Sequence, residues 1–298
     1  MMRIPFELAE TLAVIVDEGT LDAAARRLHV TPSAVSQRVK ALEEQLGQVV
    51  LIRAKPARAT PTGDAIVRLA RQLALLEHDA LAGLGDDAAR TSIPLAVNAD
   101  SLTTWFLDPL ARLMQRHPVV FDLHRDDQDF TAGLLESGAV MGAVTSRSQP
   151  VAGCRVEPLG AMRYEAVATP GYVQTWLSDG LTSEAMAEAP VVYFDRRDEL
   201  QSTWLRTQGL AAAAPRQYIP ASSDFARAVF LGMGWGLLPG FQSDEGLADG
   251  SLVRLGGEPV DVPLHWQQWN LRSPLLDAVA AEVISEGRRV LRRLPAGG

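Results

Sequence analysis

The sequence predicts an α/β protein in three parts: a small helical unit ending in a strand hairpin, one long helix, and a larger two-lobed body. Three observations predict this division. Residues 6–46 carry three helical apolar patterns, and a basic hairpin follows them. Residues 66–80 repeat apolar side chains at heptad spacing. From residue 93 onward, short apolar strands alternate with helices, as in α/β folds.

Composition excludes several classes of protein. A chain of 298 residues is long enough for two or three domains, and 47% hydrophobic against 21% charged residues predicts a buried core. No apolar run approaches the roughly 18 residues of a membrane span. The start, Met1 to Glu7, does not resemble a secretory signal, and the single Cys154 allows no disulfide framework. We therefore expect a cytoplasmic protein without a membrane partner.

Charge is distributed unevenly along the chain. The net charge of −8 by itself argues weakly against a nucleic-acid partner. Yet the segment from Arg26 to Arg58 holds seven cations against only Glu43 and Glu44. A basic segment in an acidic chain indicates one phosphate-binding module joined to a different body.

Three helices are expected in the first fifty residues. The first ends at Gly19, and the second covers about Asp22 to Leu28. After the turn at His29 and Val30, Thr31 is a good N-cap and Pro32 suits the first helical position, where no amide donor is needed. The third helix should run to about Leu46 and end at Gly47.

The third helix has an apolar face and a polar face. Val35, Val39, Leu42 and Leu46 form the apolar stripe, while the polar face carries hydroxyls, an amide and a cation. Such groups bind phosphates and base edges, and Gln37 could pair with an adenine edge. A strand over residues 49–52 and the basic tip 53–58 read as a wing. The alternative is a solvated face without a partner. The predicted DNA contacts of this winged helix-turn-helix are Arg26, Thr31, Pro32, Ser33, Ser36, Gln37, Arg38, Lys40, Arg53, Lys55 and Arg58.

A long linker helix should follow. Thr60-Pro61 repeats the cap-and-proline signal, and the apolar residues behind it have spacings of three and four. Such a seam needs a partner, which is either a second copy of the chain or the helix's own domain. A hinge is expected at residues 83–87. The seam residues are Ile66, Leu69, Leu73, Leu76 and Ala80.

The body alternates strands with helices. In lobe I, strands are expected at 93–97, 119–123 and 140–144, with helices at 109–116 and 130–136. The chain should enter lobe II around Arg163 to Thr169. Lobe II should hold strands at 190–194, 218–219 and 235–238 and helices at 198–208 and 224–231, before strand 264–271 and helix 274–294 return to lobe I.

The expected domains are 1–60, the linker 61–90 and the effector body 91–298, with lobe I at about 91–165 and 268–298 and lobe II at about 166–267. Two lobes joined by two crossovers resemble periplasmic-binding-protein-like (type 2) folds. Such folds hold small ligands at the carboxyl ends of the strands.

Enzymatic signals are missing. The Gly232-x-Gly234-x-Gly236 stretch has the wrong spacing for a dinucleotide site and precedes a strand. The five histidines show no metal spacing, and nothing in the sequence places a nucleophile beside a base. We expect no catalytic residue, no metal and no cofactor.

The N-terminal sixty residues resemble the DNA-binding domain of LysR-type transcriptional regulators. The resemblance rests on the Gly19 to Ala25 turn region, the helix start Thr31-Pro32-Ser33-Ala34-Val35-Ser36, and the exit Leu42-Glu43-x-x-Leu46-Gly47. It implies a homodimer or a tetramer, double-stranded DNA with a pseudo-palindromic operator, and RNA polymerase as partners.

Stretches across nearly the whole chain resemble one LysR subgroup, the ArgP/LysG (chromosome initiation inhibitor) regulators. That resemblance implies L-lysine or L-arginine as effector and control of genes such as a basic amino acid exporter. The stretches are residues 45–49, 56–60, 97–102, 104–106, 141–145, 153–155, 159–164 and 265–266. Residues 232–239 resemble a turn of LysR effector domains in general.

A basic amino acid needs donors for its carboxylate and at least one acid for its buried cation. Polar residues after expected strands meet these needs. Several of these residues, and Trp105, also have a plainer interpretation: Ser222 or Ser223 as helix caps, Asp100 and Asp127 as solvated loop acids, and Trp105 and Trp266 as core. The candidate effector residues are Asp100, Ser101, Thr103, Asp127, Thr145, Ser222, Ser223, Asp224 and Trp266.

Three hypotheses for function follow. The first is a LysR-type regulator switched by lysine or arginine. The second is an effector-independent protein that binds the nucleoid or a replication origin. The third, an enzyme on a binding-protein scaffold, lacks the clustered nucleophile or metal set that it requires.

Overall fold

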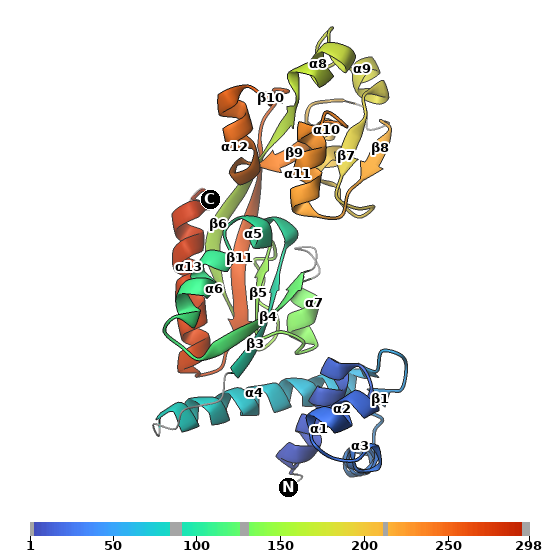
Figure 1. The fold of residues 1–298 in the computed structure, drawn as a ribbon, viewed down its shortest axis with the longest axis vertical. Coiled ribbons are helices and arrows are strands. Elements are labelled where there is room, and N and C mark those ends of the chain that lie inside the picture. The colour runs from blue at the N-terminus through green and yellow to red at the C-terminus, as the bar shows by residue number, and fades with distance from the viewer. Residues whose placement is uncertain (1–2, 84–90, 126–130, 211–213, 294–298) are drawn as a thin grey trace. The chain divides into compact units, whose positions relative to one another are not determined.

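The computed structural model describes residues 3–83, 91–125, 131–210 and 214–293 and divides into two compact units (Figure 1). Unit 1 comprises Met1–Val97, Leu110–Glu157 and Trp266–Glu282. Unit 2 comprises Asn98–Pro109, Pro158–His265 and Val283–Gly298. The chain enters the large segment of unit 2 at Pro158, before the expected passage at residues 163–169.

The N-terminal part of unit 1 has the expected helices and wing. Helices α1, α2 and α3 surround a core built from Leu12, Ile15, Val35 and Leu42, all fully buried. Figure 1 shows them clustered around the first half of α4. The elements are α1 (Phe6–Glu18), α2 (Leu21–Arg27), α3 (Pro32–Leu46), the antiparallel strands β1 (Leu51–Ile52) and β2 (Arg58–Ala59), and α4 (Pro61–Gly83).

Threonine caps begin several helices, as the sequence predicted for two of them. Thr31 Oγ1 accepts a hydrogen bond from the Ala34 amide, and Thr60 Oγ1 accepts one from the Gly63 amide. Each cap satisfies an amide that has no partner inside its helix. Thr169 begins α8 in the same way, and that helix was not expected from the sequence.

Only part of the predicted apolar seam of α4 is exposed to solvent. Ile66 is 6% exposed and belongs to the core of the N-terminal helices, together with Val67 and Ala70. The prediction that Ile66 lies on a dimer seam was wrong, because α1 packs against that side of α4. Leu73 and Leu76 are exposed, Ala80 is exposed, and Leu69 is half-buried.

Unit 1 also holds a parallel α/β layer. Strand β3 pairs in parallel with β4 on one side and β5 on the other, as the strand–helix alternation predicted. Ile93 and Leu95 of β3 and Val144 of β5 are fully buried. The elements are β3 (Thr91–Val97), α6 (Leu107–Met114, which begins in unit 2), β4 (Val119–Arg125), α7 (Thr131–Glu136) and β5 (Gly142–Thr145).

Unit 2 is built around long and short strands. Among the described residues, the sheet order is β10-β6-β11-β5-β3-β4, with β9 paired to β6. Strands β6 and β11 each extend into both units, as the two expected crossovers require. The elements are α5 (Ala99–Thr104), β6 (Cys154–Ala168), α8 (Pro170–Trp176), α9 (Ser183–Glu188), β7 (Val191–Tyr193), α10 (Leu200–Thr207), β8 (Arg216–Tyr218), α11 (Ser222–Phe230), β9 (Gly236–Pro239), α12 (Gly240–Asp249), β10 (Val253–Arg254), β11 (Val260–Trp269) and α13 (Pro274–Val290).

Several elements were missed or displaced in the sequence reading. Helices α5, α8, α9 and α12 were not expected, and β6 is one strand of 15 residues within which the chain passes from unit 1 to unit 2. Helix α11 begins at Ser222, and its N-cap is Ala221, which makes no side-chain cap bond. The interpretation of Ser222 or Ser223 as the cap was therefore wrong. No helix in the described ranges is long and apolar enough to cross a membrane.

Candidate functional site

The polar face of α3 is open to solvent. Ser33, Gln37 and Lys40 are exposed and Ser36 is half-buried, while Val35 and Val39 of the same helix are buried. Thr31 and Pro32 at the start of the helix are also exposed. The N-terminus of α3 thus presents hydroxyls, an amide side chain and the positive end of the helix dipole together. This combination suits a phosphate and the neighbouring base edges.

Cations flank this face on two sides. Arg26 near the end of α2 and Arg53, Lys55 and Arg58 of the wing are exposed. In the part of the chain that the structure describes, none of these four makes an ion pair. Lys40 lies 3.5 Å from Glu44, and both side chains are mostly exposed, so that pair contributes little. These cations are therefore available to an anionic ligand.

Arg38 has a different environment from the other predicted contacts. Its guanidinium pairs with Glu7 of α1 and donates to Thr11 Oγ1 at 3.3 Å. Its side chain is only 24% exposed. We therefore assign Arg38 to the packing of α3 on α1 and remove it from the proposed DNA contacts.

In unit 2 the structure brings two of the predicted effector residues together. The Ser222 hydroxyl, at the start of α11, donates to Asp100 Oδ1 at 2.6 Å. The Tyr164 hydroxyl, on β6, donates to Asp100 Oδ2 at 2.7 Å. Gln242 of α12 donates in turn to Ser222 Oγ at 2.9 Å. Asp100 is half-buried in the first turn of α5, so three elements converge on one carboxylate.

A second acid lies in the same region of unit 2. Asp198 accepts hydrogen bonds from the amides of Phe194 and Leu200, both at 3.0 Å. Burial raises the pKa of Asp198, and the charge of Asp100 raises it further, while these hydrogen bonds oppose the shift. The hydrogen bonds show that Asp198 organises its own loop, and its charge adds to the negative potential around Asp100.

The remaining candidates have varied environments. Ser101 of α5 is fully buried and its hydroxyl has no hydrogen-bond partner among the described residues, whereas the exposed Thr103 donates to Ala99 O of its own helix at 2.9 Å. In unit 1, Thr145 is buried at the end of β5 and accepts from the Arg147 amide at 3.2 Å. Trp266 is 1% exposed, which agrees with its interpretation as a core residue, and its indole donates to Gln268 at 2.8 Å.

Three of the predicted effector residues remain. Ser223 and Asp224 on α11 are exposed, unlike Ser222 beside them. Asp127 lies outside the described residues.

The sequence reading missed Tyr164, Gln242 and Asp198. Tyr164 lies 64 positions from Asp100 and Ser222 lies 122 positions from it. No local spacing can report such pairings. The one available signal was the Tyr164 phenol itself, since a phenol that becomes buried usually needs a hydrogen-bond partner. In the described ranges, no group of three or more metal-binding side chains occurs.

Comparison with protein families finds two matching segments in this chain. Residues 6–64 match the bacterial regulatory helix-turn-helix protein model of the lysR family, and residues 87–287 match the LysR substrate binding domain. The chain belongs to the LysR family of transcriptional regulators. The resemblance drawn from the sequence is thereby confirmed, and the family is one of regulators rather than enzymes.

Named LysR regulators are similar along nearly the whole chain. The HTH-type transcriptional regulator LysG of Mycobacterium tuberculosis is 48% identical over 91% of this chain and 90% of its own length. The lysine export transcriptional regulatory protein LysG of Corynebacterium glutamicum is 38% identical over 97% of this chain and 99% of its own. The full-length structure of LysG from C. glutamicum with bound effector Arg superimposes with a TM-score of 0.79 and 37% identity, covering 97% of this chain and 100% of that one.

Proposed function

We propose that this LysR-type regulator is switched by L-arginine or L-lysine, and that it controls genes for export or metabolism of basic amino acids. Asp100 is the proposed acceptor for the cationic group of the effector. Ser101 and Ser222, which lie in the same unit as Asp100, are proposed to complete that site, and Thr145 of unit 1 stays a separate candidate contact.

One observation carries the effector proposal. Both oxygens of Asp100 accept hydrogen bonds from neutral hydroxyls, those of Tyr164 and Ser222, and in the described residues no lysine, arginine or histidine pairs with it. Hydroxyl donors hold the carboxylate in place without neutralising it. A half-buried carboxylate whose charge is not compensated attracts an ammonium or a guanidinium group. The neighbouring acid Asp198 strengthens that preference for a cation.

The similar regulators support this choice of ligand. LysG of C. glutamicum is named for lysine export, and LysG from the same organism was also solved with bound arginine. Their names state what those proteins do, and the residues around Asp100 give a physical reason why the same chemistry suits this chain.

We propose DNA contacts from the α3 face and the wing, without Arg38. We call the helix-turn-helix with its wing, from α1 to β2, the DNA-reading head. Two copies of the head would read the two halves of a pseudo-palindromic operator. The proposed homodimer contact is the exposed part of the predicted α4 seam, where Leu73 and Leu76 are each 37% exposed and Ala80 is exposed. A tetramer, contact with RNA polymerase and a cytoplasmic location follow from the resemblance and belong to the same proposal.

Isothermal titration calorimetry on the full chain tests the effector. We expect heat of binding with L-arginine and L-lysine. L-citrulline keeps the shape of arginine without its charge, and L-norleucine keeps the aliphatic chain of lysine without its ammonium group. Both should bind at least about tenfold more weakly, because one charge-assisted hydrogen bond contributes about 1.5–3 kcal/mol. Equal binding of arginine and citrulline would sink the assignment of a cation site. Binding of no amino acid would favour the effector-independent alternative.

Sedimentation velocity tests the dimer seam. Leu73→Glu with Leu76→Glu should shift the chain toward the monomer, because burying two carboxylates in an apolar seam without partners is costly. Ala74→Glu, at an exposed position of the same helix outside the proposed seam, is the matched control. An unchanged sedimentation coefficient in the double variant would contradict the seam.

A further inference from the structure

The side chains of two arginines on α4, Arg68 and Arg71, contact the α/β layer of unit 1. Arg68 donates to Ala152 O at 3.2 Å and lies 3.9 Å from Cys154 Sγ. Its guanidinium also lies over the ring of Trp269, 5.6 Å from the centroid. Burial raises the pKa of the Cys154 thiol, so this contact joins the cation to a neutral sulfur. Arg68 therefore attaches α4 to both β6 and β11.

Two glycines allow the layer to approach α4 this closely. Gly138 and Gly153 have φ angles of +74° and +75°, which other residues rarely adopt. A Cβ atom at Gly138 would lie 2.5 Å from Arg68 Cβ, and one at Gly153 would lie 2.9 Å from the Arg68 guanidinium. Any side chain at Gly138 would thus force the loop away from the backbone of α4. The contact is a closely fitted one.

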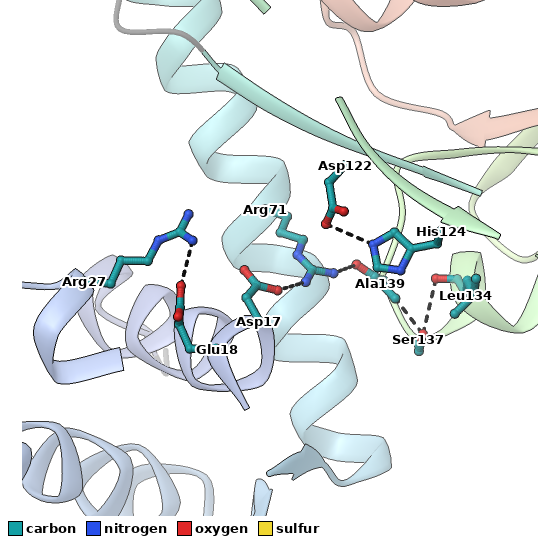
Figure 2. Close-up of polar contacts among 10 residues, drawn as sticks. Asp17, Glu18, Arg27, Arg71, Asp122, His124, Leu134, Ser137 and Ala139 are labelled. Atoms are coloured by element: carbon teal, nitrogen blue, oxygen red, sulfur yellow. Dashed lines mark hydrogen bonds and ion pairs between the residues drawn. The ribbon is translucent and has the colours of Figure 1, made fainter. Parts of the chain in front are cut away.

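Arg71, one turn later on α4, connects three elements (Figure 2). One of its terminal nitrogens donates to Gly138 O, and the other pairs with Asp17 at the end of α1. The Arg71 side chain is only 13% exposed, and that of Asp17 is 38% exposed. A single guanidinium therefore joins the helix-turn-helix, the linker helix and the loop before β5.

The loop that Arg71 holds is itself well fixed. Ser137 Oγ donates to Leu134 O at 3.2 Å and accepts from the Ala139 amide at 3.4 Å (Figure 2). Strand β5 begins shortly after this loop and ends at Thr145, a proposed effector residue. Likewise β11 carries both Trp266 and Trp269, the ring under Arg68. Side-chain contacts of Arg68 and Arg71 therefore connect α4 to β11 and to the loop before β5.

We propose that Arg71, supported by Arg68, couples the regulatory α/β layer to the DNA-reading head. Displacement of β5 or β11 moves Gly138, and Arg71 carries that movement to Asp17 and α1. The direction of signalling rests on the proposed function, because it assumes an effector at the strand ends. The contact of Arg71 with Asp17 and Gly138, which we call the joint, exists whether or not arginine is the effector.

Asp17→Asn in the full chain tests the joint by hydrogen–deuterium exchange. The substitution removes the charge that Arg71 binds. The matched control is Glu18→Gln, because Glu18 is the adjacent acid and pairs with Arg27 at 2.9 Å instead of with α4 (Figure 2). Without any ligand, Asp17→Asn should speed exchange in α1 and also in residues 137–141, by up to about fivefold for a partly exposed ion pair. Glu18→Gln should leave residues 137–141 unchanged. Exchange at 137–141 that does not respond to Asp17→Asn would overturn the joint.

Gly138→Ala approaches the joint from the other side. It should speed exchange in α1, whereas Gly133→Ala, at a glycine with no atom near its missing Cβ, should not.

L-arginine is then added to the wild-type chain and to Asp17→Asn. We expect a changed exchange in α1 of the wild type only, with residues 137–145 responding in both. A response of α1 that persists in Asp17→Asn would overturn the coupling. Absence of arginine binding in calorimetry would instead reject the proposed effector, while the ligand-free result still decides the joint.

Discussion

The DNA-reading face and the Asp100 site differ in how they are assembled. The face of α3 comes from one continuous segment, with its cap, its proline and its buried stripe all within Pro32–Leu46 and the preceding Thr31. The Asp100 site combines α5, β6, α11 and α12, with partners up to 122 positions apart. One is exposed, rich in cations and local, whereas the other is half-buried, acidic and dependent on the tertiary fold.

This difference separates the two kinds of recognition physically. An exposed cationic face binds a polyanion mainly by releasing counter-ions, so its affinity should depend strongly on salt. A half-buried carboxylate fixed by two hydroxyls binds through short charge-assisted hydrogen bonds, which salt screens much less. Substitutions in one region should therefore leave the other function intact.

The largest expected effect is at Asp100. Asp100→Asn should weaken binding of L-arginine by about 10- to 100-fold, since it removes the charge from a hydrogen bond of about 1.5–3 kcal/mol. Ligand-free DNA affinity should not change. Asp224→Asn, an exposed acid on α11, serves as the control, and calorimetry is the measurement. Equal losses in the two variants would mean that Asp100 has no special role.

The next effect concerns Gln37. Gln37→Ala should cost about 1–3 kcal/mol at one base pair of a preferred duplex and nothing at the others. The duplex is first selected from random sequences by the full chain, and every base-pair variant is then titrated. A uniform loss across all positions would instead assign Gln37 to the phosphates.

The smallest effect compares two arginines of the head. Arg53→Ala should reduce the slope of log affinity against log salt by about one, as expected for a single phosphate contact. Arg38→Gln should leave that slope unchanged and lower the thermal stability, because Arg38 joins α3 to α1 through Glu7 and Thr11. The opposite pattern would reverse the two assignments.

Sequence reasoning succeeded where local rules determine structure. The caps at Thr31 and Thr60, the stripe of Val35, Val39 and Leu42, and the parallel β3–β4 pairing follow from short-range patterns. It was wrong for Ile66, because the heptad spacing does not reveal that α1 covers that side of α4. It chose Asp100 and Ser222 as separate candidates but could not pair them.

The pairing depends on tertiary structure. Ser222 was a candidate effector residue, and its alternative interpretation was a helix cap, because a serine beside an expected helix start usually is one. Its hydroxyl instead donates to Asp100, and Tyr164 reaches the same carboxylate from a strand that was not expected as one element. Likewise, no sequence signal distinguishes Arg71, which joins three elements, from Arg58, which is exposed on the wing.

The central claim is that binding of a basic amino acid at Asp100 controls DNA binding by the α3 face and the wing. Footprinting of the full chain on its selected duplex, with and without L-arginine, tests it most directly. The account predicts that L-arginine or L-lysine alters the protected pattern and L-citrulline does not, and that Asp100→Asn binds the duplex but no longer responds. A pattern that stays the same when calorimetry shows arginine bound to the wild-type chain would contradict the claim.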